Sequence, residues 1–264
     1  MKNYEKYSKM VEAWRNFVFP ARPSEDEMEI FDELMSKHVD QKLLILGATP
    51  EFRDLGLKYK MEVTCADINP DMLEGMKFLM KQENKNEKLI ETDWLKMPFD
   101  DNTFDVIFAE QSINILTTDK FEDFFKENKR VLKQGGIFVL KIIIQSQQTD
   151  DEVIKIYKEE NRDIHFLYDQ LFHVKKRYDH NGQGSHKRLG EDFGELLKQG
   201  KISQEDYDKF FAAWGAIVKA DLKLNAMEQK DFDKLAKKYF QIKSILFGKD
   251  KVFHCLHPIY VFKK

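Results

Sequence analysis

Cysteine is scarce in this sequence, which has only Cys65 and Cys255 among its 264 residues. Two isolated thiols provide neither a disulfide framework nor a cysteine cluster with metal-ligand spacing. We therefore expect no metal site and a reducing, cytoplasmic environment.

Long apolar runs and a strong excess of one charge are also missing. No stretch approaches the roughly 20 apolar residues that cross a bilayer, and Met1–Met10 is polar and charged where a secretory signal would be apolar. The 43 basic residues are nearly balanced by 46 acidic ones, which gives a formal net charge of −3. Because nucleic-acid binders depend on a positive field, we expect neither a nucleic acid nor a membrane as partner.

Glycine and proline are too few for a collagen-like or disordered chain, with 12 and 6 residues, and the hydrophobic share of 42% is that of a globular protein. Aromatic residues are plentiful by contrast, with 22 Phe and 9 Tyr. So many aromatic residues predict mainly core packing, with an aromatic-lined pocket as the alternative. The sequence gives no indication of oligomeric state.

Short apolar runs alternate with amphipathic helical stretches through the first half of the chain, which is typical of βαβ units and a parallel sheet. Helices are expected over Asp71–Gln82 and Lys120–Leu132, where Met or Phe recurs at helical spacing. The expected strands are Leu43–Leu46, Met61–Ala66, Lys88–Glu91, Asp105–Ala109, Gly136–Ile144, Tyr239–Phe247 and Phe253–Phe262. The predicted fold class is α/β, with a doubly wound, seven-stranded, mostly parallel sheet.

Three capping boxes mark helix starts outside this core, and they lie at Ser24/Glu27, Thr149/Glu152 and Ser203/Asp206. The helix after Ser203 carries aromatic residues on one face, and a polar loop over 179–185 lies between the helices. We expect four segments, listed in chain order: an N-terminal helical cap (1–40), the cofactor-binding α/β core (41–150), a helical insertion that caps the substrate (151–235), and the final strands of the sheet (236–264).

The segment KLLILGATPEFRDL, which begins at Lys42, combines a strand, a glycine and a helix start. Ligands of open α/β sheets bind at such carboxyl strand ends. Thr49 is placed to cap the helix and Pro50 to occupy its first turn, which leaves N–H groups free beside a ligand. Thr49 stands where the second glycine of the dinucleotide fingerprint would be, so pyrophosphate binding is not expected.

Acidic residues follow the next three strands. Asp67 lies twenty residues after Gly47, at the spacing of an acid that accepts hydrogen bonds from ribose hydroxyls. Asp93 and Trp94 follow the third strand and could bind an adenine amine and stack on its ring, and Glu110 ends the fourth strand. The structural alternatives are a loop cap for Asp67, a core position for Trp94 and a solvated strand end for Glu110.

In this order of features, Leu43–Ile144 resembles the core of the class I S-adenosylmethionine-dependent methyltransferases. The stretch FEDFFKENKRVLKQGGIFVLK before and through the fifth expected strand and the final CLHPIYVFKK carry the same resemblance. The first loop departs from the usual glycine-rich E/D-x-G-x-G pattern. It is similar to a subset of the family with an LG-x-TPE loop and an upstream RPSE-like segment, here Arg22–Glu25.

This resemblance implies S-adenosylmethionine as the cofactor. It implies that Gly47, Ala48 and Thr49 line the methionine moiety, while Asp67 holds the ribose and Asp93 with Trp94 the adenine. Arg22 would meet the cofactor carboxylate, unless it forms an ion pair on the surface. The complete expected cofactor site is Arg22, Gly47, Ala48, Thr49, Asp67, Ile68, Met72, Asp93, Trp94, Glu110, Gln111 and Ser112, of which the last three would lie near the reacting methyl group.

The expected reaction is transfer of that methyl group to a small-molecule acceptor by in-line displacement, which requires no obligatory base. Candidate bases are Glu110, His165, Tyr168 and His173, and a histidine on an amphipathic helix can equally be a packing residue. Three alternatives stay open at this point: a cyclase or lyase that uses the same cofactor, a nucleic-acid methyltransferase, and a binding module without catalysis.

Overall fold

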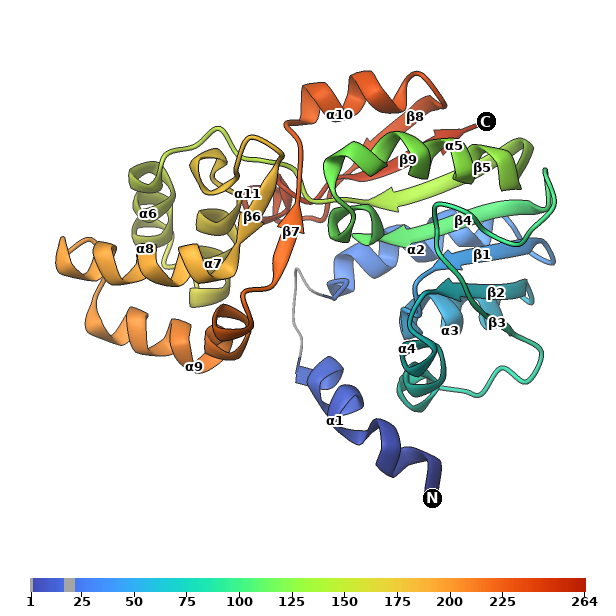
Figure 1. Cartoon of the computed structure of the whole chain (residues 1–264), viewed down its shortest axis with the longest axis horizontal. Coiled ribbons are helices and arrows are strands. Elements are labelled where there is room, and N and C mark those ends of the chain that lie inside the picture. Colours follow the sequence, from blue (N-terminus) through green and yellow to red (C-terminus); the bar gives the residue numbers. More distant parts are fainter. Residues whose placement is uncertain (1, 17–21) are drawn as a thin grey trace.

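The computed structural model describes residues 2–16 and 22–264, which form an α/β lobe beside a helical lobe (Figure 1). No helix in this part of the chain is long and apolar enough to cross a membrane. The helices are α1 (Lys2–Asn16), α2 (Glu25–Ser36), α3 (Pro50–Lys58), α4 (Pro70–Gly75), α5 (Phe121–Val131), α6 (Asp150–Glu159), α7 (Ile164–His173), α8 (His186–Lys198), α9 (Gln204–Ala220), α10 (Gln229–Ala236) and α11 (Lys251–His254), with short 3-10 turns at Met76–Leu79, Ser112–Ile115, Thr118–Lys120 and Lys175–Arg177.

One seven-stranded sheet organises the α/β lobe. Its strands are β1 (Lys42–Leu46), β2 (Glu62–Asp67), β3 (Lys88–Glu91), β4 (Phe104–Glu110), β5 (Leu132–Lys141), β8 (Gln241–Leu246) and β9 (Ile259–Lys263). They lie in the order β3-β2-β1-β4-β5-β9-β8, and β9 is antiparallel to both of its neighbours. The predicted doubly wound, mostly parallel sheet of seven strands is therefore confirmed.

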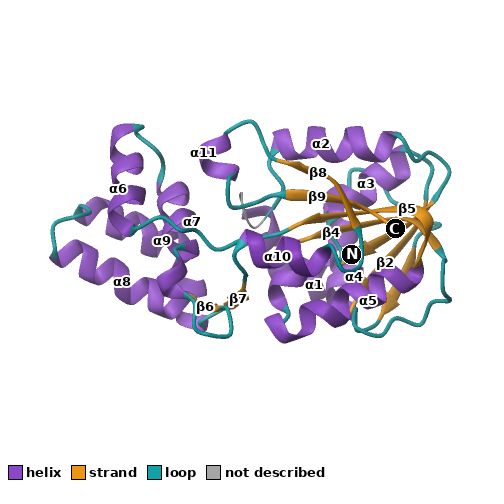
Figure 2. Cartoon of the chain, turned by 90° about the horizontal axis from the view of Figure 1, so that it is seen from above, coloured by secondary structure: helices purple, strands orange, loops and turns teal. Residues whose placement is uncertain are grey.

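Helices cover both faces of this sheet, as strands with nearly continuous apolar sequence require. Four of the five residues of β1 are buried. On one face, α2 and α3 bring Phe31 and Phe52 into a cluster with Phe108 of β4. On the other face lie α5 and α10 (Figure 2). They contribute Phe125 and Phe232 to a second cluster.

The N-terminal segment divides into two parts with different roles. The predicted capping box at Ser24 and Glu27 is confirmed, and α2 which it begins is a layer of the core. In contrast, α1 lies against α4 and the turn that follows it. Lys6 forms an exposed ion pair with Asp71, and the ring of Tyr4 meets that of Phe78 edge-on. The segment expected as a cap over 1–40 thus includes a helix of the core, and a capping role for α1 stays a prediction.

The helical lobe comprises α6 to α9 and has an apolar core of its own. The rings of Tyr168 and Trp214 stack with centroids 3.9 Å apart, and those of Phe193 and Phe210 stack at 3.8 Å. The predicted capping boxes at its helix starts, Thr149/Glu152 and Ser203/Asp206, are confirmed. The sequence analysis missed a two-stranded antiparallel sheet in this lobe, formed by β6 (Gln183–Ser185) and β7 (Lys223–Asn225).

The strand expected over Gly136–Ile144 lies at Leu132–Lys141, and two further expected elements are wrong in extent. The helix expected over Asp71–Gln82 ends at Gly75 and continues only as a 3-10 turn to Leu79. The strand expected over Phe253–Phe262 begins at Ile259, because Asp250 caps the short helix α11 by accepting a hydrogen bond from the Phe253 N–H. In both cases a local side-chain cap or turn outweighs the apolar pattern.

Candidate cofactor and active site

The loop after β1 lies against the end of β2. Gly47 has φ +105, in the left-handed region that glycine adopts most readily, and its N–H donates to the Ala66 carbonyl. A Cβ atom at Gly47 would lie 3.9 Å from Asp67 Oδ2. The structure therefore brings together the glycine and the acid that the sequence places twenty residues apart.

Helix α3 begins directly after this loop, with Pro50 in its first turn as predicted. Thr49 occupies the N-cap position, but its side chain makes no capping hydrogen bond, so the expected cap is wrong. Its backbone has φ −50 and ψ 111, outside the extended conformation of a usual N-cap residue. The first-turn N–H groups consequently have no side-chain acceptor from Thr49, while Ala48 and Thr49 themselves are buried.

Arg22 forms an ion pair with Glu51, which is the alternative that the sequence left open for this arginine. The pair uses Oε1 of Glu51. The other oxygen, Oε2, is buried without a hydrogen-bond partner among the described residues. An unpaired buried carboxylate oxygen is costly, and this one lies in the first turn of α3. The sequence analysis did not select Glu51, although it stands in the TPE loop.

Asp67 ends β2 with its carboxylate partly buried. Oδ1 accepts the Asn69 N–H at 2.8 Å, and burial raises the pKa of the Asp67 carboxyl above its ordinary value. Beyond it, Ile68 is 69% exposed and Met72 is half-buried at the start of α4. An apolar side chain of this size on the surface is unusual and offers a contact for a planar ligand.

Asp93 and Trp94 follow β3 and point to different environments. Asp93 is exposed, and its Oδ1 accepts the Leu95 N–H at 2.9 Å. The indole of Trp94 is 7% exposed, packs in the core and donates its N–H to the Ala66 carbonyl at 2.6 Å. This packing is the structural alternative noted for Trp94, and the stacking of its ring on an adenine stays a prediction.

The end of β4 places Glu110, Gln111 and Ser112 beside the glycine loop. Ser112 Oγ donates to the Leu46 carbonyl at 2.9 Å, which ties the ends of β4 and β1 together. Gln111 has φ 52, a left-handed conformation that is uncommon outside glycine and often marks functional sites. Burial raises the pKa of Glu110 to about 8, although the Lys141 ammonium 3.3 Å away acts in the opposite direction.

Lys141 at the end of β5 connects Glu110 to α2. Its ammonium is fully buried and lies 2.7 Å from Glu27 Oε2, and Glu27 also contacts His254 Nδ1 at 3.3 Å. Sequence reasoning missed this network. The run VLKIII could have indicated the network. It places a lysine within a buried strand, and a buried lysine needs a carboxylate partner.

The three candidate bases of the insertion lie on α7 of the helical lobe. His165 contacts the ring of Trp214, and the Tyr168 hydroxyl lies 2.7 Å from His186 Nε2. His173 is buried and contacts Asp169. Glu110 is therefore the only one of the four candidates among the strand-end residues described above.

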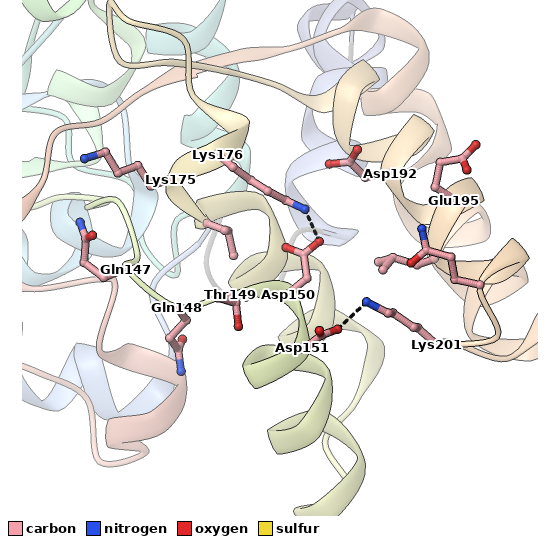
Figure 3. Close-up of a pocket in the computed structure, with 13 residues that line it drawn as sticks. Gln147, Gln148, Thr149, Asp150, Asp151, Lys175, Lys176, Asp192, Glu195 and Lys201 are labelled. Atoms are coloured by element: carbon pink, nitrogen blue, oxygen red, sulfur yellow. Dashed lines mark hydrogen bonds and ion pairs between the residues drawn. The ribbon is translucent and has the colours of Figure 1, made fainter.

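A pocket of about 740 Å³ opens within the helical lobe (Figure 3). Charged side chains dominate its wall, where Lys176 pairs with Asp150 and Lys201 pairs with Asp151. All residues that line it fall between Gln147 and Lys201, so neither the N-terminal segment nor an expected cofactor residue reaches it. The expected aromatic substrate pocket is thus not this one, because the aromatic rings of the insertion pack in its core.

Comparison with known proteins agrees with this geometry. Residues 47–140 match the family described as a methyltransferase domain. A sterol 4-C-methyltransferase of Caenorhabditis elegans is 32% identical over 114 residues, which are 42% of this chain and 32% of that protein. The match therefore spans about a third of the length of this curated relative.

Two solved structures share the fold over nearly the whole chain. The PH0226 protein of Pyrococcus horikoshii has a TM-score of 0.60 at 20% identity and covers 96% of this chain and 98% of its own. The 1,6-didemethyltoxoflavin-N1-methyltransferase of Burkholderia thailandensis, solved with S-adenosylhomocysteine, has a TM-score of 0.55 at 10% identity and covers 98% of this chain and 84% of its own. The strand order and these two structures show the Rossmann-like methyltransferase fold, and within it residues 47–140 match the methyltransferase-domain family.

Proposed function

We propose that this chain transfers the methyl group of S-adenosylmethionine to a small-molecule acceptor. The observation that carries the proposal is the position of Asp67, whose carboxylate faces Gly47 across the ends of β1 and β2. An acid in this place accepts hydrogen bonds from two ribose hydroxyls, and the glycine lets the cofactor approach the backbone. Asp93 follows β3 at the same edge of the sheet, where it would accept a hydrogen bond from an adenine amine.

The charged end of the cofactor fits the groups around α3. S-adenosylmethionine carries an ammonium and a sulfonium, and Glu51 offers a buried carboxylate oxygen that lacks a partner among the described residues. Glu51 would hold the ammonium by a charge-assisted hydrogen bond. The open N–H groups at the start of α3 and the Arg22 guanidinium would hold the carboxylate.

When bound, the cofactor supplies an electrophilic methyl group, so the chain has to orient a nucleophile in line and exclude water. Glu110 is the residue placed to exchange a proton with an acceptor, because its raised pKa makes both protonation states accessible near neutral pH. Chemistry of the cyclase or lyase type would use the same binding residues. Detection of a methylated product, and not of a cleaved aminobutyrate arm, separates the two.

The class of acceptor is inferred from charge and not from the sterol-methylating relatives. The formal net charge is −3, which disfavours a nucleic acid. The match to the methyltransferase-domain family covers residues 47–140, and the helical insertion lies outside it. We therefore propose a small molecule, in a cytoplasmic setting, without assigning it to the sterols.

Calorimetry with three adenosine-containing ligands tests the cofactor, and it is the first prediction. The chain should bind S-adenosylmethionine and its demethylated product, whereas NAD should give no heat of binding because the loop lacks the dinucleotide glycines. A screen of small acceptors with methyl-labelled cofactor then tests transfer. Tight binding of NAD alone would overturn the proposal, and cofactor binding without turnover of any acceptor would support a binding module instead.

A further inference from the structure

Asp169, His173 and His257 converge where the helical lobe meets the end of the sheet. We propose that these three side chains form a binding site for one divalent transition-metal ion of the Zn²⁺ type. Asp169 and His173 lie four residues apart on α7, so they project from the same helix face. His257 comes from the segment just before β9 and closes the set from the α/β lobe.

The distances suit such an ion. His257 Nε2 lies 2.9 and 3.0 Å from the two carboxylate oxygens of Asp169, and His173 Nε2 lies 3.3 Å from Oδ1. One ligand atom from each residue lies within 4.8 Å of the other two. Tetrahedral zinc with bonds of roughly 2.0–2.1 Å separates its ligand atoms by roughly 3.3 Å, so binding requires only small shifts.

The surrounding residues orient the ligands. The Tyr178 hydroxyl lies 2.7 Å from His173 Nδ1, and Gln170 Nε2 donates to Asp169 Oδ2 at 2.9 Å. A metal on Nε2 leaves Nδ1 protonated, and the tyrosine oxygen is in position to accept that N–H. Such outer hydrogen bonds are a regular feature of histidine-containing metal sites.

Burial and charge point in the same direction. The three side chains are between 0 and 3% exposed. No lysine or arginine within residues 2–16 and 22–264 forms an ion pair with Asp169. A carboxylate so deeply buried requires a positive charge close by. One protonated imidazole would supply that positive charge. It would not explain why a second imidazole nitrogen also lies against the same carboxylate, whereas a metal ion bound by both histidines would.

Two imidazoles and a carboxylate form a ligand set that zinc accepts in proteins. An ion here would tie α7 of the insertion to the segment before β9, two parts that are distant in sequence. None of the three ligands is among the residues assigned to S-adenosylmethionine. The occupancy of the metal site can therefore be measured without the cofactor and without an acceptor.

Metal content of the full chain provides the test. The protein is unfolded with a chelator present, refolded with Zn²⁺ or with the spectroscopic substitute Co²⁺, and freed of excess metal. We expect one ion per chain by elemental mass spectrometry, visible absorption from Co²⁺ in a nitrogen and oxygen environment, and a higher Tm with Zn²⁺. A refolded chain with native circular dichroism and no bound metal would overturn the proposal in favour of a hydrogen-bonded triad.

Variants locate the ion. His257→Gln should weaken metal binding by more than about 100-fold, and Tyr178→Phe, which keeps all three ligands, by roughly 10- to 100-fold. His165→Gln alters a histidine on the same helix outside the triad and should leave the affinity unchanged. If His257→Gln does not fold, Tyr178→Phe decides. Equal affinity in wild type, Tyr178→Phe and His165→Gln would place the metal elsewhere and reject the site.

Discussion

Asp67 is the side chain through which the cofactor's ribose should be recognised. Asp67→Ala removes charge-assisted hydrogen bonds worth roughly 1.5–3 kcal/mol each, so calorimetry should show a dissociation constant for S-adenosylmethionine at least about tenfold higher. Asp100→Ala is the matched control, because this exposed acid lies in the loop before β4. It is therefore at the end of the parallel strands opposite to the expected cofactor site. An unchanged dissociation constant in Asp67→Ala would give Asp67 a local structural role only.

Glu110 gives the fold a pH dependence of defined sign. Its folded-state pKa of about 8 lies above the ordinary value of 4.5, so the folded chain holds a proton that the unfolded chain releases. The stability from this group is fully present below about pH 4.5 and is lost as the pH rises to about 8, at up to about 1.4 kcal/mol per pKa unit. Urea unfolding should therefore show stability falling more steeply with pH in wild type than in Glu110→Gln.

The two pH profiles should run closest to parallel outside this window, which provides an internal control for the substitution itself. Parallel profiles throughout the window would mean that Glu110 is ionised in the folded state. The lowering of its pKa by Lys141 would then outweigh the raising of its pKa by burial.

Residues of the site differ in how far the sequence could predict them. Gly47 and Asp67 were predictable because each ends a strand, and parallel strands bring such ends to one edge. Glu27, Lys141 and His257 come from three separate segments, and their contacts depend on how those segments pack. A single sequence does not show how distant segments pack, so a lysine within an apolar run is the one warning it gives of such a network.

Helix α3 packs closely against the sheet, and this packing holds the position of the loop between β1 and α3. A Cβ atom at Gly56 would lie 2.5 Å from Val63 Cγ2 and 3.1 Å from Leu43 Cδ2. Gly56→Ala should therefore cost about 1–3 kcal/mol of unfolding free energy through overpacking, as measured by urea denaturation. Because α3 also carries Glu51, this variant should weaken cofactor binding as well.

Gly194 provides the opposite case on α8. A Cβ atom there meets nothing within 4 Å. Gly194→Ala should raise stability by about 0.5–1 kcal/mol, since alanine restricts the unfolded chain and favours the helix. A loss of stability at Gly56 no larger than the change at Gly194 would show that α3 can move away from the sheet at little cost.

The elements show where sequence patterns are sufficient. Strand β3 and three capping boxes were predicted because apolar runs and caps act within a few residues. The pair β6–β7 was not, because its two strands of three residues lie far apart in the chain and depend on tertiary contacts. Short strands of this kind have no periodicity to detect.

At the scale of the whole molecule, the carboxyl ends of β4 and β5 point towards the helical lobe (Figure 1). The chain leaves β5 and enters α6 of that lobe, and it returns through β7 and α10 to the sheet. Helix α1 lies on another side, against α4, which follows the expected ribose-binding Asp67. The lobe therefore lies beyond the carboxyl ends of β4 and β5, and α1 lies beside the helix that follows Asp67.

This arrangement predicts where cofactor binding should slow hydrogen exchange. Closure adds contacts to segments that otherwise open locally, so amides of α1 and of α6 to α9 should gain protection with S-adenosylmethionine or its product. The sheet and α2 should change less, because α2 is already part of the core and serves as the internal control for the N-terminal segment. Asp67→Ala, measured at the same ligand concentration, should show a smaller gain in protection because it binds the cofactor more weakly.

Equal protection throughout the chain would indicate general stabilisation by the ligand, and protection confined to the strand ends would leave the insertion as scaffold. In either case the acceptor site would have to be sought away from the helical lobe.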